Sequence, residues 1–263
     1  MALGGVIFAC SSIGTQGTPR MSDLDEVTRL PDDFDGCVRL FPLPELVVFP
    51  HAMQPLHIFE PRYCDMLSEC LATDKLIAMA TLTSGVADLL SARPRIAAMV
   101  CIGKVVSHAE TDDGRHNVLL IGAKRARVIR EIQTARSFRM AEVHVQVDVH
   151  QPMDAPKRNQ LRAELLDAFA AVIPPSANVQ HNLHELMAGQ MGLGPITDII
   201  AFTLGLGREA KLQLLEEVNV DRRARVLIKM LRLLRTGETE AASGQGGSKK
   251  PILPEFPPPF SRN

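Results

Sequence analysis

The sequence of residues 39–63 reads RLFPLPELVVFPHAMQPLHIFEPRY. Its apolar run at residues 46–49 is bracketed by Pro44 and Pro50, a pattern that predicts a short buried strand. Pro61 stands where the first turn of a helix tolerates proline. The apolar residues that follow it recur at helical spacing and are Tyr63, Met66, Leu67, Cys70 and Leu71. The stretch therefore predicts a strand and then a helix with one apolar face, which ends at residues 74–75.

Beyond this helix the chain is mostly extended. A strand is expected at residues 76–82. Two further apolar segments, residues 96–106 and 117–121, flank the sequence Thr111-Asp112-Asp113-Gly114. Because an Asp-Gly pair favours the backbone of a tight turn, these two segments are expected to form a hairpin.

Glycines interrupt both arms of the expected hairpin, at Gly103 and Gly122. Such glycines indicate bulges or sharp bends, as are needed to curl a sheet toward a barrel. Another strand is expected around residues 128–129. From Ala141 to Val149 apolar and polar residues alternate strictly, which predicts a strand with one solvated face.

At Pro152 the apolar period changes from that of strands to that of helices. Helices are expected at residues 161–172, capped by Asp154 and ended by Pro174-Pro175, then at residues 179–191, ended by Gly192, at 195–204, at 209–217 and from Asp221 onward. Strands thus come first and helices second. This segregation predicts the α+β class with two packed parts.

The domain boundaries follow from the same pattern. Residues 1–36 are interpreted as a flexible extension in which Met21 is a plausible true start, and residues 37–150 as a β subdomain. Residues 151–235 form the helical subdomain. From Thr236 onward Gly, Ser, Glu, Lys and Pro dominate, a composition typical of a disordered tail.

Composition excludes several classes of protein. The 29 basic and 30 acidic residues give a net charge of -1, so the chain as a whole is not attracted to a phosphate backbone or an anionic membrane. No apolar run approaches the roughly 18 to 20 residues of a membrane span. Five scattered cysteines without a C-x-x-C pair argue against a disulfide framework and favour the cytoplasm.

No motif predicts catalysis, a metal or a cofactor. A phosphate-binding loop would need a lysine that the segment 189–194 lacks. Two loose groups could hold a metal, but neither has a recognised ligand spacing, and solvated polar side chains are the simpler interpretation. These groups are His181, His184 and Glu185, and His51, His57 and Cys64.

Two basic clusters keep RNA binding open as an alternative function. They are Lys124, Arg125, Arg127 and Arg130, and, on the last helix, Arg222, Arg225, Lys229 and Arg232. A stripe of this kind can follow phosphates, but more often it is the solvated face of an amphipathic helix. Neutral net charge and an aromatic content of 4% argue against RNA.

The quoted stretch resembles the opening of the LON domain, the N-terminal substrate-recognition domain of ATP-dependent Lon proteases, in the variant found in bacterial stand-alone proteins. Further segments match that family in order. These are Ile102-Gly103, the segment GAKRARV at 122–128, the segment SFRMAEV at 137–143, the segment KLQLLE at 211–216, Val220 and Arg222-Arg223. The resemblance covers residues 37–235.

This resemblance implies a curled, PUA-like β pseudo-barrel followed by a helical bundle. The ATPase and Ser-Lys peptidase modules of full Lon proteases are not found in this sequence, so the chain is not expected to be an enzyme. The expected role is binding of unfolded polypeptide segments or of a protein partner such as a separate Lon-type protease, in protein quality control or proteolysis. No membrane partner is expected.

The candidate polypeptide-binding residues are Phe59, Glu60, Arg62 and Tyr63, with Arg125 as an ionic partner of Glu60. A purely structural interpretation stands beside this one. In it, Pro61 and Tyr63 only fix the entry of the helix, and a pair between Arg125 and Glu60 only braces the barrel.

Overall fold

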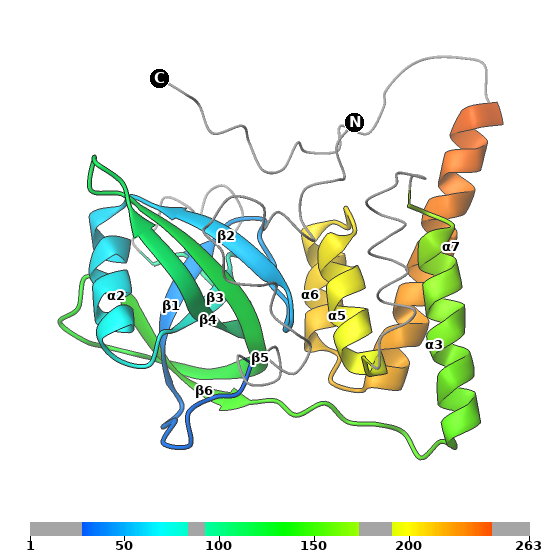
Figure 1. Ribbon diagram of the computed structural model, residues 1–263, viewed down its shortest axis with the longest axis horizontal. Coiled ribbons are helices and arrows are strands. Elements are labelled where there is room, and N and C mark those ends of the chain that lie inside the picture. The colour runs from blue at the N-terminus through cyan, green and yellow to red at the C-terminus, as the bar shows by residue number, and fades with distance from the viewer. Residues whose placement is uncertain (1–27, 84–92, 174–190, 244–263) are drawn as a thin grey trace, which may run out of the picture.

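The computed structural model describes residues 28–83, 93–173 and 191–243 of the chain. It shows a sheet with a helical bundle beside it (Figure 1). The strands are β1 (Cys37–Leu43), β2 (Met53–Ile58), β3 (Leu76–Thr81), β4 (Met99–Glu110), β5 (His116–Ile132) and β6 (Arg139–Val145). The described helices are α2 (Pro61–Ala72), α3 (Ala155–Ala170), α5 (Leu193–Thr203), α6 (Arg208–Glu216) and α7 (Val220–Ser243). The expected α+β class is confirmed.

The sheet curls on itself. Its strand order is β2-β5-β4-β3-β1-β6, and an additional pairing between β5 and β6 closes five of the strands into an irregular barrel. Strand β5 makes this possible because its 17 residues are long enough to pair with β2, β4 and β6 in succession. Among the described strands β1 and β3 alone pair in parallel, and β2 and α2 lie in the long connection between them.

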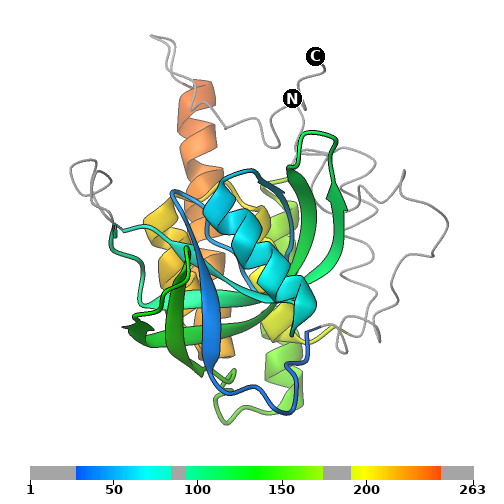
Figure 2. The same ribbon diagram turned by 90° about the vertical axis from the view of Figure 1, so that its left-hand side faces the viewer.

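Side chains of alternate residues fill the two faces of the barrel wall, as expected for a strand period of two. On β1, Val38 and Leu40 join one apolar cluster with the small side chains of Ala78 and Ala126. The neighbouring Phe41 instead joins a second cluster, which includes the buried face of α2. Helix α2 therefore covers one side of the barrel, as Figure 2 shows.

The predicted strand at residues 46–49 is wrong. Val47, Val48 and Phe49 are buried and Leu46 is partly buried, but none of them has a strand partner. Residues 45–51, which we call the strap, pass between the barrel and the bundle, so Val47 and Phe49 belong to the bundle core whereas Val48 belongs to the barrel core. A packed irregular segment between two prolines has the same apolar composition as a buried strand. The sequence pattern therefore predicted a strand where there is none.

Both hairpin glycines mark irregular pairing, as expected. The register between β4 and β5 shifts between Ile102 and Gly103, where Gly103 lies opposite Gly122. A Cβ atom on Gly122 would lie 2.0 Å from the Phe49 carbonyl oxygen, because the strap crosses β5 at that point. Gly122 also donates its N–H to the Ala52 carbonyl. This glycine is needed for close contact with the strap.

Other expected boundaries need correction. Residues 128–129 are part of β5 and do not form a separate strand, and β6 ends at Val145, after which the chain leaves the barrel toward α3. Within the extension expected to be flexible, Leu30 and Phe34 pack against the barrel core. The predicted helix at residues 179–191 lies almost wholly outside the described residues.

The helices that follow agree with the pattern in type and in approximate position. Asp154 caps α3 as expected, since its Oδ1 accepts the Lys157 N–H at 3.1 Å. Gly192 is the N-cap of α5. Its expected role at the end of the helix predicted at residues 179–191 concerns residues outside the description. Helix α7 continues to Ser243, beyond Thr236 where the tail was expected to begin.

Candidate functional site

The candidate residues lie where β2 ends and α2 begins. Glu60 is the N-cap of α2 and Pro61 opens its first turn. The Glu60 carbonyl accepts the N–H groups of Tyr63 and Cys64 at 2.8 and 3.0 Å. Because β2 is held by β5 and α2 is packed on the barrel, the short connection between them is fixed from both sides.

Phe59 is the apolar group that this connection exposes. Its side chain is 60% exposed, although it follows Ile58, which is 1% exposed. The His57 ring lies 6.0 Å from the Phe59 ring, and His57 Nδ1 is 2.9 Å from Asn117 Oδ1 on β5. An aromatic ring held at the surface beside polar groups can bind an apolar side chain of a partner.

Glu60 and Arg62 form an exposed ion pair beside Phe59. Arg62 donates from Nη2 and Nε to Glu60 Oε2 at 2.7 and 3.0 Å, and both side chains are about half exposed. The Arg62 guanidinium also lies 4.6 Å from the centre of the Tyr63 ring. The charges of this pair are therefore available at the rim of the Phe59 surface.

Tyr63 has a structural role. It is 5% exposed, and its ring lies 4.6 Å from that of Phe41 on β1. Burial raises the pKa of its hydroxyl, so the side chain stays neutral. The structural interpretation of Tyr63 as the residue that fixes the helix entry matches this position, and a partner would meet Phe59, Glu60 and Arg62 first.

Arg125 does not belong to this surface, and its expected pairing with Glu60 is wrong. It is 3% exposed and donates to Asp148 and Asp198, both at 2.6 Å. Because Arg125 lies on the part of β5 that faces the bundle, it binds the carboxylate of Asp148, in the segment between β6 and α3, and that of Asp198 on α5. The two partners lie 23 and 73 residues away along the chain. Spacing in the sequence therefore could not predict either of them.

The edge of β2 is a second feature of the site that the sequence pattern did not reveal. Among the described strands β2 pairs with β5 alone, so its other edge has no strand partner there. The Gly122 N–H bonds to the Ala52 carbonyl, which makes Gln54, Leu56 and Ile58 the hydrogen-bonded positions toward β5. Pro55 therefore faces the open edge, where it has no N–H to donate.

Other groups of the described residues offer no chemistry at this site. No set of three or more His, Cys, Asp or Glu side chains there could hold a metal ion, which includes His51, His57 and Cys64. Residues 181–185 lie outside the description. Burial raises the pKa of Cys70 to about 12 and raises that of Cys101, so both thiols stay protonated. No described helix is long and apolar enough to span a bilayer.

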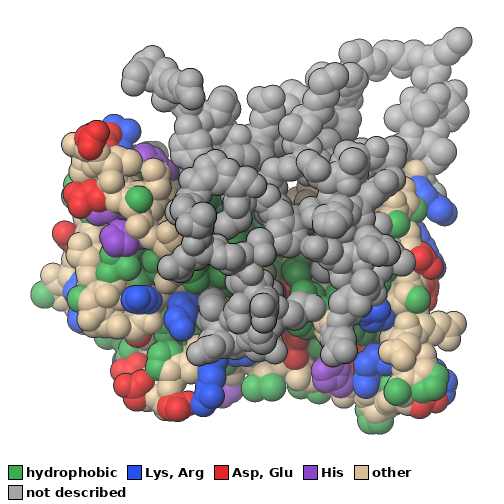
Figure 3. Space-filling view, in the orientation of Figure 1, with side chains coloured by type: hydrophobic (Ala, Val, Ile, Leu, Met, Phe, Trp, Pro, Cys, Tyr) green, Lys and Arg blue, Asp and Glu red, His purple; other side chains and the backbone are tan. Residues whose placement is uncertain are grey.

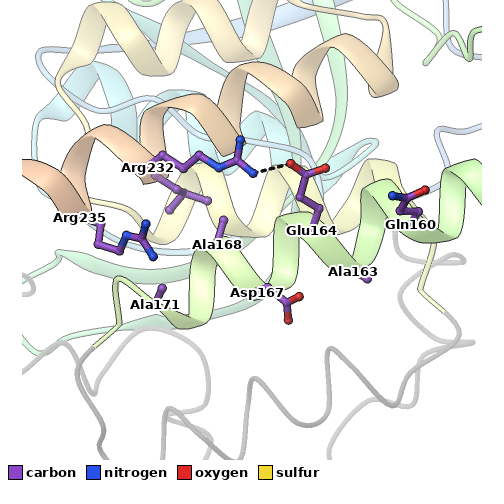
Figure 4. A pocket seen from close by; sticks show the side chains of 9 residues that line it. Gln160, Ala163, Glu164, Asp167, Ala168, Ala171, Arg232 and Arg235 are labelled. Atoms are coloured by element: carbon purple, nitrogen blue, oxygen red, sulfur yellow. Dashed lines mark hydrogen bonds and ion pairs between the residues drawn. The ribbon is translucent and has the colours of Figure 1, made fainter.

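A shallow hollow of about 480 Å³ lies on the bundle, between α3 and α7 (Figure 4). The figure shows Arg232 of α7 reaching Glu164 of α3, where Nη2 donates to Oε1 at 2.6 Å. Polar and small side chains, together with Leu231, line the remainder of this hollow. It is separate from the connection between β2 and α2.

The described chain is a two-part domain, with an irregular barrel, a helical bundle beside it, and an exposed aromatic residue between β2 and α2. The family model described as the ATP-dependent protease La (LON) substrate-binding domain matches residues 38–232. The chain therefore belongs to the family of LON substrate-binding domains.

Individual relatives agree with this family. The chain is 24% identical over 194 residues to a Lon protease of Dictyoglomus thermophilum, a match that covers 73% of this chain and 24% of that protein. It is 33% identical over 94 residues to a Lon protease of Brucella abortus, covering 36% of this chain and 12% of the relative. The chain thus spans about a quarter or less of the length of these relatives.

Solved structures show the same fold. A Lon N-terminal domain protein from Xanthomonas campestris aligns with a TM-score of 0.54 at 23% identity, covering 73% of this chain and 97% of that one. The N-terminal domain of a Mycobacterium avium complex Lon protease aligns with a TM-score of 0.56 at 17% identity, covering 74% and 98%. Both likenesses concern the two-part fold.

Proposed function

We propose that this chain binds polypeptide segments of other proteins, without catalysis, on the surface formed by Phe59, Glu60 and Arg62. The observation that carries the proposal is the exposure of Phe59 in a connection that is fixed on both sides. Its family is described as substrate-binding, and the relatives it matches are Lon proteases. The substrate class that fits is therefore polypeptide.

The surface has the properties that sequence-tolerant binding needs. Phe59 offers apolar area that an unfolded segment can bury, and burial of such area is the main source of affinity for flexible chains. Since the connection is already ordered, binding costs little entropy on this side of the interface. The adjoining Glu60 and Arg62 carry opposite charges, so the rim does not select strongly for acidic or basic segments.

Side chains should contribute more to recognition than backbone pairing. Pro55 interrupts the row of donors on the open edge of β2, as prolines do on edge strands that avoid pairing with other chains. A bound segment can therefore form only a short backbone contact near His57. This supports an anchor at Phe59 over the addition of a full strand.

The link to proteolysis is part of the same proposal. A domain that recognises polypeptide can deliver it to a separate Lon-type protease, or it can hold the segment without any cleavage. The surface formed by Phe59, Glu60 and Arg62 carries no hydroxyl, thiol or imidazole, and the thiols of Cys70 and Cys101 are buried and protonated. Binding is thus the activity that the site supports.

A binding measurement with a permanently unfolded, carboxymethylated polypeptide tests the proposal. Phe59→Ser should weaken binding at least about tenfold, equivalent to about 1.4 kcal/mol. Ile129→Ser is the matched control, because Ile129 is 57% exposed on β5, away from the connection. Equal affinity of the Phe59→Ser variant and the native chain would contradict the proposed site.

RNA binding is the outcome that would overturn the function. Arg125 is buried, Arg130 pairs with Glu142 at 2.7 Å and Arg232 pairs with Glu164, so the basic clusters are partly neutralised. In Figure 3 acidic, basic and histidine side chains are intermixed over the visible described surface. Binding of RNA that falls steeply with salt, without binding of the polypeptide, would favour the alternative.

A further inference from the structure

Four charged side chains join the barrel to the bundle in a closed ring. Arg125 of β5 donates to Asp148 and to Asp198 of α5, both at 2.6 Å. Arg223 of α7 donates to Asp148 at 2.8 Å and lies 3.3 Å from Asp198. Two positive and two negative charges therefore alternate at the junction and balance one another.

The ring is almost completely enclosed. Exposed fractions are 3% for Arg125, 0% for Arg223 and 1% for Asp198, whereas Asp148 is 29% exposed. Both guanidinium groups make further hydrogen bonds. Arg125 donates to the Leu215 carbonyl, and Arg223 donates to Thr197 Oγ1 and to the Glu217 carbonyl. Burial of such a set is tolerated only while every charge keeps its partner.

The strap carries a titratable group at the junction, between Phe49 and Ala52, which pack against the bundle. His51, the last residue of the strap, has φ of 64° and donates its N–H to the Gly122 carbonyl. Burial lowers the pKa of its imidazole, against the opposing charge of Asp198. Lys124 and Arg125 act in the same direction as burial, and Asp148 opposes them.

Asp148 is the second titratable group, and the part of the ring that protons can reach. Burial alone would raise the pKa of its carboxyl, but the hydrogen bond from Arg223 and the charges of Arg223, Arg125 and His150 lower it. Burial raises the pKa of the nearby Cys101 thiol, so that this group stays protonated. The acid-sensitive groups at the junction are thus His51 first and Asp148 at lower pH.

We propose that the junction is an acid-sensitive joint, at which proton uptake by His51 and then Asp148 loosens the bundle from a barrel that stays folded. A proton on either group makes the surroundings of Arg125 and Arg223 more positive. The ring contains no further carboxylate that could balance this charge. We expect the bundle to separate before the barrel unfolds, because two of the three apolar clusters contain no residue of the bundle. The third joins Val47, Phe49, Ala52 and Met99 to the helices.

The sign of the effect follows from linkage. A histidine whose pKa is lower in the closed form binds more protons when the junction opens, so closing weakens as pH falls below the ordinary value of about 6.5. One proton raises the opening constant by up to about tenfold per pH unit in that range. Asp148 adds to this only near and below pH of about 4.

Hydrogen exchange of the whole chain at pH 7.0 and pH 5.0, corrected for the intrinsic effect of pH, tests the joint. Amides of α5 and α6 should open about tenfold more often at pH 5.0, while those of β3 and β4 should keep their protection. His51→Asn should abolish this difference, because its amide does not titrate and asparagine tolerates positive φ. An equal rise in the variant, or a parallel rise in β3 and β4, would refute the proposal.

A second variant separates the joint from general loss of stability. Asp148→Asn should raise exchange in α5 and α6 at pH 7.0 without affecting β3 and β4. The matched control is Glu142→Gln, which removes the exposed pair with Arg130 between β5 and β6 and should leave exchange in the bundle unchanged. Native protection of α5 and α6 in Asp148→Asn would show that the ring does not hold the joint.

Discussion

At the residue scale, single positions decide contacts that no local pattern describes. Gly122 is the clearest example, because its missing side chain lets the Phe49 carbonyl approach to a distance at which no Cβ fits. Arg125 is another, since its neighbours in sequence are barrel residues whereas its partners are Asp148 and Asp198. Both residues act at the place where the strap, the barrel and the bundle meet.

Gly122→Ala should lower the free energy of unfolding by about 3 kcal/mol, because a Cβ atom there would displace the backbone of the strap. Urea unfolding followed by circular dichroism measures the change. Gly207→Ala is the control, since no atom lies within 4 Å of its Cβ position, and it should cost less than about 1 kcal/mol. Equal effects of the two variants would show that the strap adjusts without cost.

At the element scale, α3 is a helix with local support at its start, where it follows the segment 146–154 that leaves β6. Asp154 provides this support by accepting the Lys157 N–H. Strand β2 is the opposite case, an edge strand whose position depends wholly on β5 and on the turn into α2. Local sequence predicts the first kind of element better than the second.

Asp154→Ala should destabilise the chain by about 1 kcal/mol, because the first turn of α3 loses its side-chain acceptor. Asp154→Asn keeps an acceptor oxygen and should recover most of that loss. Thermal unfolding at constant pH compares the three chains. If the alanine and asparagine variants unfold at the same temperature, the cap does not contribute through this hydrogen bond.

The helical period and the turn chemistry explain why most elements could be predicted. α2 begins at Pro61 as expected, and the Asp-Gly turn joins β4 to β5. The strap could not be predicted, because its apolar residues face two different cores and so alternate like a strand. The segment Phe59–Tyr63 was found from its resemblance, but Tyr63 turned out to be buried.

At the scale of the whole molecule, the buried charges at the junction dominate the response to mutation. Arg223→Met should cost about 3 to 5 kcal/mol, because it leaves Asp148 and Asp198 with one buried guanidinium between them. Arg130→Met, which breaks an exposed pair, should cost less than about 1 kcal/mol. Chemical denaturation measures both, and equal small losses would mean that water replaces Arg223.

Acid should destabilise the barrel through Glu69 as well. Burial would raise the pKa of its carboxyl, but Arg136 and Arg39 lower it further than burial raises it. Its contribution is therefore present above the ordinary carboxyl pKa of about 4.3 and is lost as pH falls through the folded value. Glu69→Gln should make the acid unfolding curve shallower below that pH, whereas Glu142→Gln should not change it.

The sequence by itself determined that strands come first and helices second, together with the hairpin, the cap of α3 and the family. These features depend on neighbours within a few residues, or on motifs that recur in order along the chain. Only the tertiary structure decided the path of the strap, the closure of the barrel through β5 and the partners of Arg125. The physical reason is that each of these depends on atoms brought together from distant parts of the chain, where spacing in the sequence does not constrain distance in space.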